Sequence, residues 1–152
     1  MDIKDIKDMY TSTGGEIKEF EKFEGKLEKG YNFSYEKRVT EIDVQLFGLI
    51  SGDFSPIHFD ESIALKTKFK GRVVHGMLTT SLISAALARL PGLVVIIETH
   101  FVYTAPVRIG DKVEVKGVVE EAEPERKRYK INLVCLANNR KVVEGWAKIL
   151  IW

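Results

Sequence analysis

The chain has 152 residues, of which 45% are hydrophobic and 30% charged, and this composition indicates one globular domain rather than a disordered chain. Lys and Arg total 23 against 22 for Asp and Glu, so the net charge of +1 gives no electrostatic reason to expect nucleic-acid or membrane partners. The single cysteine excludes an internal disulfide.

Residues 1–30 differ from the rest and are predicted to be a charged N-terminal extension. Apolar residues recur at helical spacing in 3–10, and again in 17–27 after the Thr-Ser-Thr-Gly-Gly break. Two short amphipathic helices packed outside the domain are expected, and a partly ordered arm is the alternative. The segment has no signal-peptide core, and no apolar run reaches the roughly 18 residues of a spanning helix. A cytoplasmic protein is predicted.

The remainder, residues 31–152, is predicted to be a single α+β domain. A strand at 32–39 precedes a helix that Thr40 caps and that ends at Ser51-Gly52, and the apolar segment 76–90 predicts a long, largely buried helix. β-branched and aromatic residues then predict four strands, at 93–107, 111–123, 126–138 and 141–152. Four strands in succession imply an antiparallel sheet, curved across the long helix. Cys135 lies inside one of these strands and is expected to pack as an inert apolar residue.

Two short motifs carry the residue types that acid/base chemistry needs. In SGDFSPIHFDE, Pro56 disfavours helical geometry at Ser55, so an irregular turn is expected to bring Asp53 and His58 together. A carboxylate beside an imidazole is a common acid/base unit, although a capped turn explains the same spacing. In VVHGM, Gly76 opens the long helix, where a free backbone amide suits a carbonyl that gains negative charge.

Other kinds of site find less support in the sequence. Asp53, His58, Asp60 and His75 include the ligand types of a metal site, but no H-x3-H or C-x2-C spacing supports one, and no metal is expected. The glycines form no phosphate-binding loop, so no nucleotide cofactor is implied. A G-x-S-x-G elbow is absent, which argues against a covalent serine hydrolase.

The order of G-D-x-S-P-I-H-x-D, F-x-G-R-V-V-H-G-M and a long apolar helix resembles the MaoC-like, (R)-specific enoyl-CoA hydratases of the hot-dog fold. This resemblance covers about residues 31–152 and implies a curved antiparallel sheet wrapped around one long helix. It implies that Asp53 and His58 activate water and that the Gly76 amide polarises a thioester carbonyl. Ser84 falls at the register of a serine in the family's active-site region. The family commonly has Asn where this chain has Ser55.

The resemblance also implies a substrate, an enoyl-CoA thioester, and a homodimer or dimer-based oligomer. Hydration needs no cofactor beyond the coenzyme A of the substrate. His75 is expected to orient or pack rather than to react. It is grouped with the candidate substrate-binding residues, and the others are Ser84, Ser55, Met77, Lys68 and Arg72. Lys68 and Arg72 belong to a basic cluster suited to the phosphates of coenzyme A, although a solvated helix face also explains it.

Two other functions fit the same residues. A thioesterase of this fold also uses a carboxylate and a helix N-terminus, but the His five residues after Asp53 favours hydration. A non-catalytic acyl-CoA-binding module would be consistent with Ser55 as a sign of a decayed site.

Overall fold

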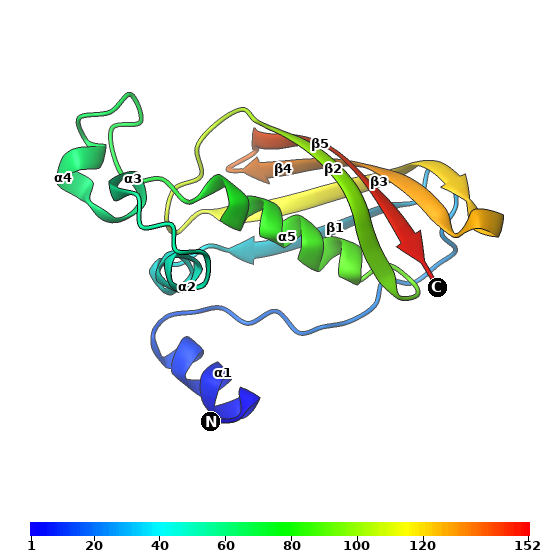
Figure 1. Cartoon of the computed structure of the whole chain (residues 1–152), viewed down its shortest axis with the longest axis horizontal. Coiled ribbons are helices and arrows are strands. Elements are labelled where there is room, and N and C mark those ends of the chain that lie inside the picture. The colour runs from blue at the N-terminus through cyan, green and yellow to red at the C-terminus, as the bar shows by residue number, and fades with distance from the viewer.

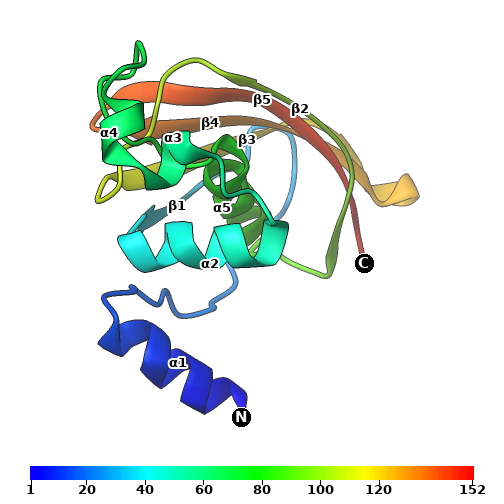
Figure 2. The same ribbon diagram turned by 60° about the vertical axis from the view of Figure 1, so that its left-hand side comes forward.

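A computed structural model describes all 152 residues and contains one five-stranded antiparallel sheet. The sheet curves around a single helix, as Figures 1 and 2 show. All five predicted strands form, and they are β1 (Asn32–Arg38), β2 (Val94–Tyr103), β3 (Lys112–Glu123), β4 (Arg128–Ala137) and β5 (Arg140–Ile151). The α+β architecture expected from the sequence is therefore present.

The strand order is β1-β3-β4-β5-β2, so the sheet is not a simple meander. After β2 the chain crosses to the opposite side of β4 and β5 before it enters β3, and β2 is left at the edge, paired only with β5. In β3 buried and less buried residues alternate, as expected for a strand with one face on the core. The edge position of β2 leaves most of its residues exposed.

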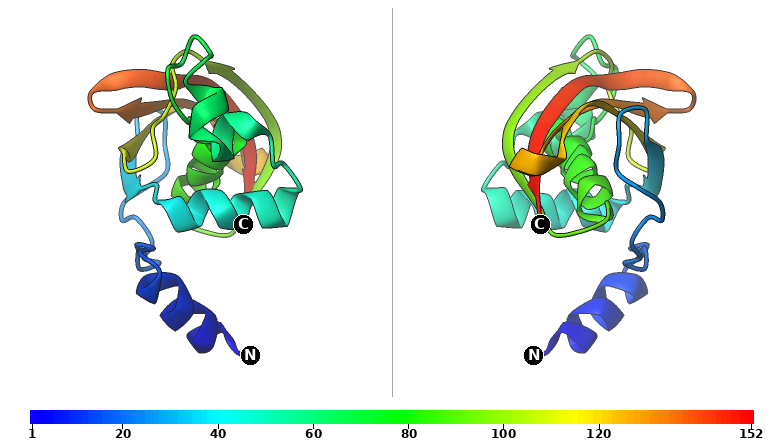
Figure 3. Two further views of the ribbon diagram at one scale, coloured as in Figure 1. Left: turned by 90° about the vertical axis from the view of Figure 1, so that its left-hand side faces the viewer. Right: turned by 90° about the vertical axis from the view of Figure 1, so that its right-hand side faces the viewer.

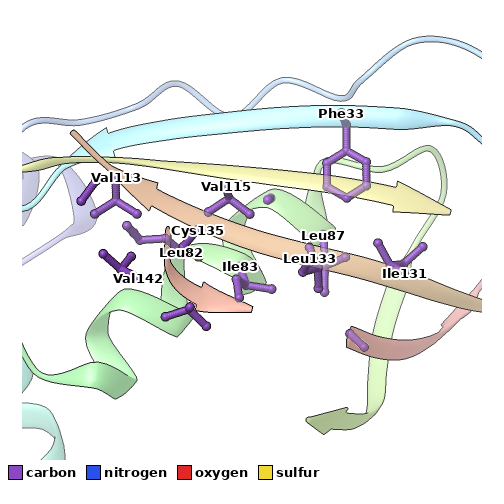
Figure 4. Packing of buried hydrophobic residues seen from close by; sticks show 14 of the residues in the cluster. Phe33, Leu82, Ile83, Leu87, Val113, Val115, Ile131, Leu133, Cys135 and Val142 are labelled. Atoms are coloured by element: carbon purple, nitrogen blue, oxygen red, sulfur yellow. The ribbon is translucent and has the colours of Figure 1, made fainter. Parts of the chain in front are cut away.

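The helix α5 (Gly76–Ala88) lies along the concave face of the sheet and supplies one side of the core (Figures 2 and 3). Ile83 and Leu87 of α5 pack with Val115 and Leu133 of the sheet in a cluster of 21 buried residues (Figure 4). Cys135 belongs to this cluster, and burial raises the pKa of its thiol to about 12. The thiol is therefore protonated and packs as predicted.

The other helices lie at the two ends of the sheet or outside it (Figure 1). They are α1 (Ile3–Ser12), α2 (Glu41–Ser51), α3 (Pro56–Phe59), α4 (Glu61–Ala64) and the 3-10 turn η1 (Pro124–Arg126). The helix α1 stands away from the sheet and contains no buried residue (Figure 3). No helix combines the length and the apolar character that crossing a bilayer requires.

The second helix expected in the N-terminal extension, over 17–27, does not form. This segment instead passes the C-terminal end of α5, where Lys22 Nζ donates to the carbonyls of Ala88 at 2.7 Å and Gly92 at 2.6 Å. Carbonyls at the C-terminal end of a helix lack donors within the helix. A cation on a neighbouring extended segment can donate to them, and this favours the extended path. Phe23 also packs against the core. The division of the chain at residue 30 stays a prediction.

Candidate active site

The turn that holds Asp53 begins where α2 ends. Gly52 adopts a left-handed conformation with φ of 80°, which ends the helix and lets the chain change direction. Asp53 Oδ1 then accepts from the backbone N–H of Ser55 at 3.1 Å, a local bond typical of an Asx turn. Ser55 therefore contributes its backbone to the shape of the turn, and its side chain is exposed.

The expected irregular backbone between Asp53 and His58 is only partly correct. Ser55 is extended, with φ of −53° and ψ of 131°, but Pro56 starts a single helical turn, α3, which carries His58. The prediction missed this turn because proline, which disfavours helix at the residue before it, is well suited to the first helical position. The turn places the imidazole of His58 beside the carboxylate of Asp53.

The Asp53 carboxylate and the His58 imidazole form the centre of the site. Asp53 Oδ2 lies 3.9 Å from His58 Nε2, beyond direct hydrogen-bond length. A water molecule about 2.8 Å from each atom would bridge them. The Asp53 side chain is 49% exposed and that of His58 only 12%, so one partner faces solvent and the other is enclosed.

The surroundings of His58 define its proton positions. Its Nδ1 lies 2.7 Å from the carbonyl oxygen of Val73, which can only accept, so Nδ1 carries the proton and Nε2 presents its lone pair near Asp53. Burial, above all, holds the pKa of His58 below its ordinary value, against the opposing effect of the bond to Val73. His58 is therefore neutral at physiological pH and able to accept a proton.

His75 lies behind His58 rather than beside a substrate cavity. It is 1% exposed, and its ring stacks on that of His58 with centroids 3.8 Å apart. His75 Nε2 lies 3.0 Å from the backbone carbonyl of Asp53, while Phe47 and Phe59 cover the rest of the ring. His75 is thus packed behind the pair by these side chains, and its assignment to substrate binding stays a prediction.

A cavity of about 390 Å³ opens beside His58 and the first turn of α5. Its lining is mainly apolar, with Lys68 and Gly76 among the residues that face it. The backbone amide of Gly76 starts α5 and has no partner within the helix. A Cβ atom at Gly76 would lie 2.8 Å from the ring of Tyr103, so only glycine fits under that ring. The amide, His58 and Lys68 are thus brought to one cavity.

Two of the other predicted substrate-binding residues lie elsewhere on α5. Met77 and Ser84 line a separate hollow of about 340 Å³ between α5 and β2. Phe101 of β2 forms part of its opposite wall. The structure therefore does not bring Ser84 to the cavity beside His58.

The guanidinium group of Arg72 binds two groups of the protein itself. Its Nε donates to the backbone carbonyl of His58 at 2.7 Å, and its Nη2 contacts Glu41 Oε1 at 2.9 Å. This arrangement ties α3 to α2, and Arg72 lines a different pocket from Lys68, the other predicted phosphate contact. Arg72 thus supports the turn that carries His58.

Tyr103 is a site residue that the sequence did not reveal. It lies in β2, lines the cavity beside His58, and its hydroxyl donates to Met77 Sδ at 3.4 Å. The pattern around it predicts only a strand, and no sequence spacing relates it to Gly76. Its contact with α5 depends on β2 occupying the sheet edge, which is a property of the tertiary fold.

Asp53, His58 and His75 offer potential metal-ligand atoms within 4.8 Å of one another. However, His58 Nδ1 and His75 Nε2 each face a backbone carbonyl, so neither nitrogen is free to bind a metal. The two rings are also stacked, so their remaining lone pairs lie in two different planes. These three residues also lack the H-x3-H or C-x2-C spacing that is common in protein metal sites. The geometry suits the activation of water by an acid/base pair.

Comparisons with known proteins point in one direction. The model of a family described as "MaoC like domain" matches residues 22–139. The 3-hydroxybutyryl-CoA dehydratase of Methylorubrum extorquens is 42% identical over 127 residues, which are 82% of this chain and 81% of that protein.

Solved structures agree with this match. A protein from Archaeoglobus fulgidus superimposes with a TM-score of 0.96 at 58% identity, over 99% of this chain and 95% of that one. An unliganded R-hydratase from Pseudomonas aeruginosa gives a TM-score of 0.75 at 36% identity, over 82% of each chain. This chain is thus similar to these proteins both in sequence and in fold.

Proposed function

The chain belongs to the MaoC-like domain family, and on that basis we propose that it is an (R)-specific enoyl-CoA hydratase. It would add water reversibly to a trans-2-enoyl-CoA to give an (R)-3-hydroxyacyl-CoA. The observation that carries the proposal is the 3.9 Å pair of Asp53 and neutral His58, which lies close to the free amide of Gly76. The names of the dehydratase and R-hydratase relatives support the same reaction.

In the proposed reaction Asp53 and His58 hold one water molecule between them. The water oxygen bonds to C3 of the substrate while His58 Nε2 accepts one of its protons, which the pair delivers to C2. With both groups acting from one side of the substrate, hydrogen and hydroxyl would add to the same face. The net change is the addition of one water molecule across the double bond, and the reaction needs no cofactor.

Negative charge develops on the thioester oxygen while the new C–O bond forms. The Gly76 amide at the N-terminus of α5 would donate to this oxygen, and the helix dipole favours the same charge. Removing a single donor of this kind from an enzyme costs about 3 kcal/mol of transition-state stabilisation. Lys68, which lines the cavity, is the proposed contact for a phosphate of coenzyme A.

The proposed working molecule is a homodimer joined along β2. This strand is at the sheet edge, and it leaves Val95 47% exposed and Ile97 48% exposed. An unpaired apolar edge favours pairing with a second strand, and two copies of β2 would extend the sheet across both chains. The hollow that contains Ser84 adjoins β2 and would lie near this contact.

Crotonyl-CoA and longer enoyl-CoA thioesters test the proposal. A hydratase removes the enoyl absorbance without releasing thiol, whereas a thioesterase releases thiol and a binding module does neither. Chiral analysis of the product is expected to give the (R)-alcohol, and an (S)-product would contradict the assigned stereochemistry. If enoyl substrates of every chain length stayed unchanged, the proposed reaction would be wrong.

A further inference from the structure

The buried ring of His75 contacts both members of the Asp53–His58 pair. Its Nε2 faces the backbone carbonyl of Asp53 at 3.0 Å, and its ring lies against that of His58 with centroids 3.8 Å apart. We propose that His75 is a positioning residue, which fixes the Asp53 turn through its hydrogen bond and keeps His58 neutral through its stacked ring. This inference rests on the proposed hydration reaction and assigns His75 no direct contact with substrate.

The hydrogen bond defines the tautomer of His75. Because the Asp53 carbonyl can only accept, Nε2 carries the proton and Nδ1 presents an unprotonated lone pair. His75 Nδ1 is buried and has no hydrogen-bond partner. Nδ1 is therefore an unpaired acceptor in an enclosed site, and the ring is held in place by Nε2 and by its aromatic neighbours. With its proton on Nε2, the ring donates to the turn that presents Asp53.

The stacking keeps water away from one face of His58. The two rings are tilted by only 28°, and behind His75 lie Phe47 at 4.8 Å and Phe59 at 5.6 Å between ring centroids. Enclosure of this kind disfavours the charged form of an imidazole. His75 thus supplies part of the burial that makes His58 a neutral base.

Several charged or polar groups act on His58 from the elements around it. Burial is the main cause of its lowered pKa, and His75 and Arg72 lower the pKa further. The carbonyl of Val73 and the carboxylate of Asp53 oppose this shift, and Lys68 lines the same cavity. Changing only the residue at position 75 leaves all of the other groups in place.

Two substitutions separate the two roles of His75. His75→Phe keeps an aromatic ring against His58 but removes the donor to the Asp53 carbonyl. His75→Gln keeps an amide N–H near the position of Nε2 but removes the ring. We expect His75→Phe to lower kcat by about ten-fold with little change in KM, since a displaced catalytic group costs rate rather than binding. We expect His75→Gln to raise the pKa of His58 and to move the acid limb of the pH–rate profile to higher pH.

The pKa of His58 can be measured directly, because the chain contains only three histidines. An NMR titration of the imidazole signals follows His58 in each variant, whether or not the variant is active. His100→Gln is the matched control, since His100 is exposed and stacks on Trp146 away from the site. It is expected to leave kcat and the His58 pKa at their wild-type values. If His75→Phe does not fold, Phe47→Leu, which loosens the packing behind His75, is expected to raise the His58 pKa.

A purely structural role for His75 predicts a different result. Both His75 variants would then unfold at lower temperature, activity per folded molecule would stay constant and the His58 pKa would not move, and this outcome overturns the inference. Failure of the proposed function is recognised separately, since wild-type protein would then hydrate no enoyl-CoA. The NMR titration would still show whether His75 controls the protonation of His58.

Discussion

At the scale of single residues, the site depends on the close packing around Gly76 and His58 and on which nitrogen of His58 carries the proton. His58 is neutral because it is enclosed. Its free lone pair is on Nε2, because the proton on Nδ1 is donated to the carbonyl of Val73. The sequence indicated Asp53, His58 and Gly76 as candidates, and the structure brings His58 and Gly76 to one cavity with Asp53 beside them. Their roles in catalysis stay predictions. The enclosure of His75 was not predictable, because stacking depends on how two distant segments meet.

Gly76→Ala tests the close approach at the start of α5. The added Cβ would lie 2.8 Å from the ring of Tyr103, so either the ring or the first turn of the helix must move. Overpacking of this size typically costs about 1–3 kcal/mol, and a displaced amide would lower kcat on enoyl-CoA as well. The measurement is a denaturant unfolding curve together with kcat.

Tyr103→Ala provides the control for this prediction. In the Gly76→Ala/Tyr103→Ala double variant the added methyl group has space, so the loss of stability from the first substitution should be smaller than in the wild-type background. Strictly additive losses would show that the Tyr103 ring is not what excludes a side chain at position 76.

At the scale of elements, strand and helix positions followed from local pattern. An alternating pattern at 32–39 and β-branched and aromatic residues in the later segments predicted every strand, and Thr40 and Gly52 indicated the two ends of α2. The position of β2 at the sheet edge and the extended path over 17–27 were missed. Both are decided by tertiary contacts: one by pairing with β5, the other by the free carbonyls at the end of α5.

Lys22→Met tests whether the extended N-terminal segment stabilises α5. The ammonium group donates to carbonyls at the C-terminal end of that helix, including Leu90 at 3.1 Å, and its removal leaves them without this donor. We expect the free energy of unfolding to fall by about 1–2 kcal/mol, from lost charged hydrogen bonds and helix-dipole stabilisation. Lys26→Met, at an exposed position in the same segment, should change it by less than about 0.5 kcal/mol. Equal effects of the two substitutions would contradict this role of Lys22.

At the scale of the whole molecule, the architecture is the hot-dog fold that the sequence resemblance implied, with a curved sheet wrapped around α5. The strand β2 closes one side of this wrap and exposes apolar residues on an unpaired edge. A second copy of the chain would cover that edge, whereas the helix α1 projects from a different part of the molecule (Figure 1).

Ile97→Lys tests the proposed contact along β2. A charge at the centre of an apolar strand edge opposes pairing, so light scattering after size exclusion should show a dimer for the wild type and the 17.3 kDa chain mass for the variant. Ile3→Lys adds the same charge at an exposed apolar residue of α1 and should leave the dimer intact. A wild-type monomer, or a dimer that Ile97→Lys does not weaken, would contradict the proposed interface.

The central claim, that Asp53 and His58 together activate water, is tested most directly by the hydration rate of crotonyl-CoA in wild-type protein, Asp53→Asn and His58→Gln. Each substitution removes one acid/base group while keeping the size of the side chain. The account predicts a hydrating wild type and a fall in kcat of about 10²- to 10⁴-fold in each variant, with the fold intact. Full activity in either variant would contradict it.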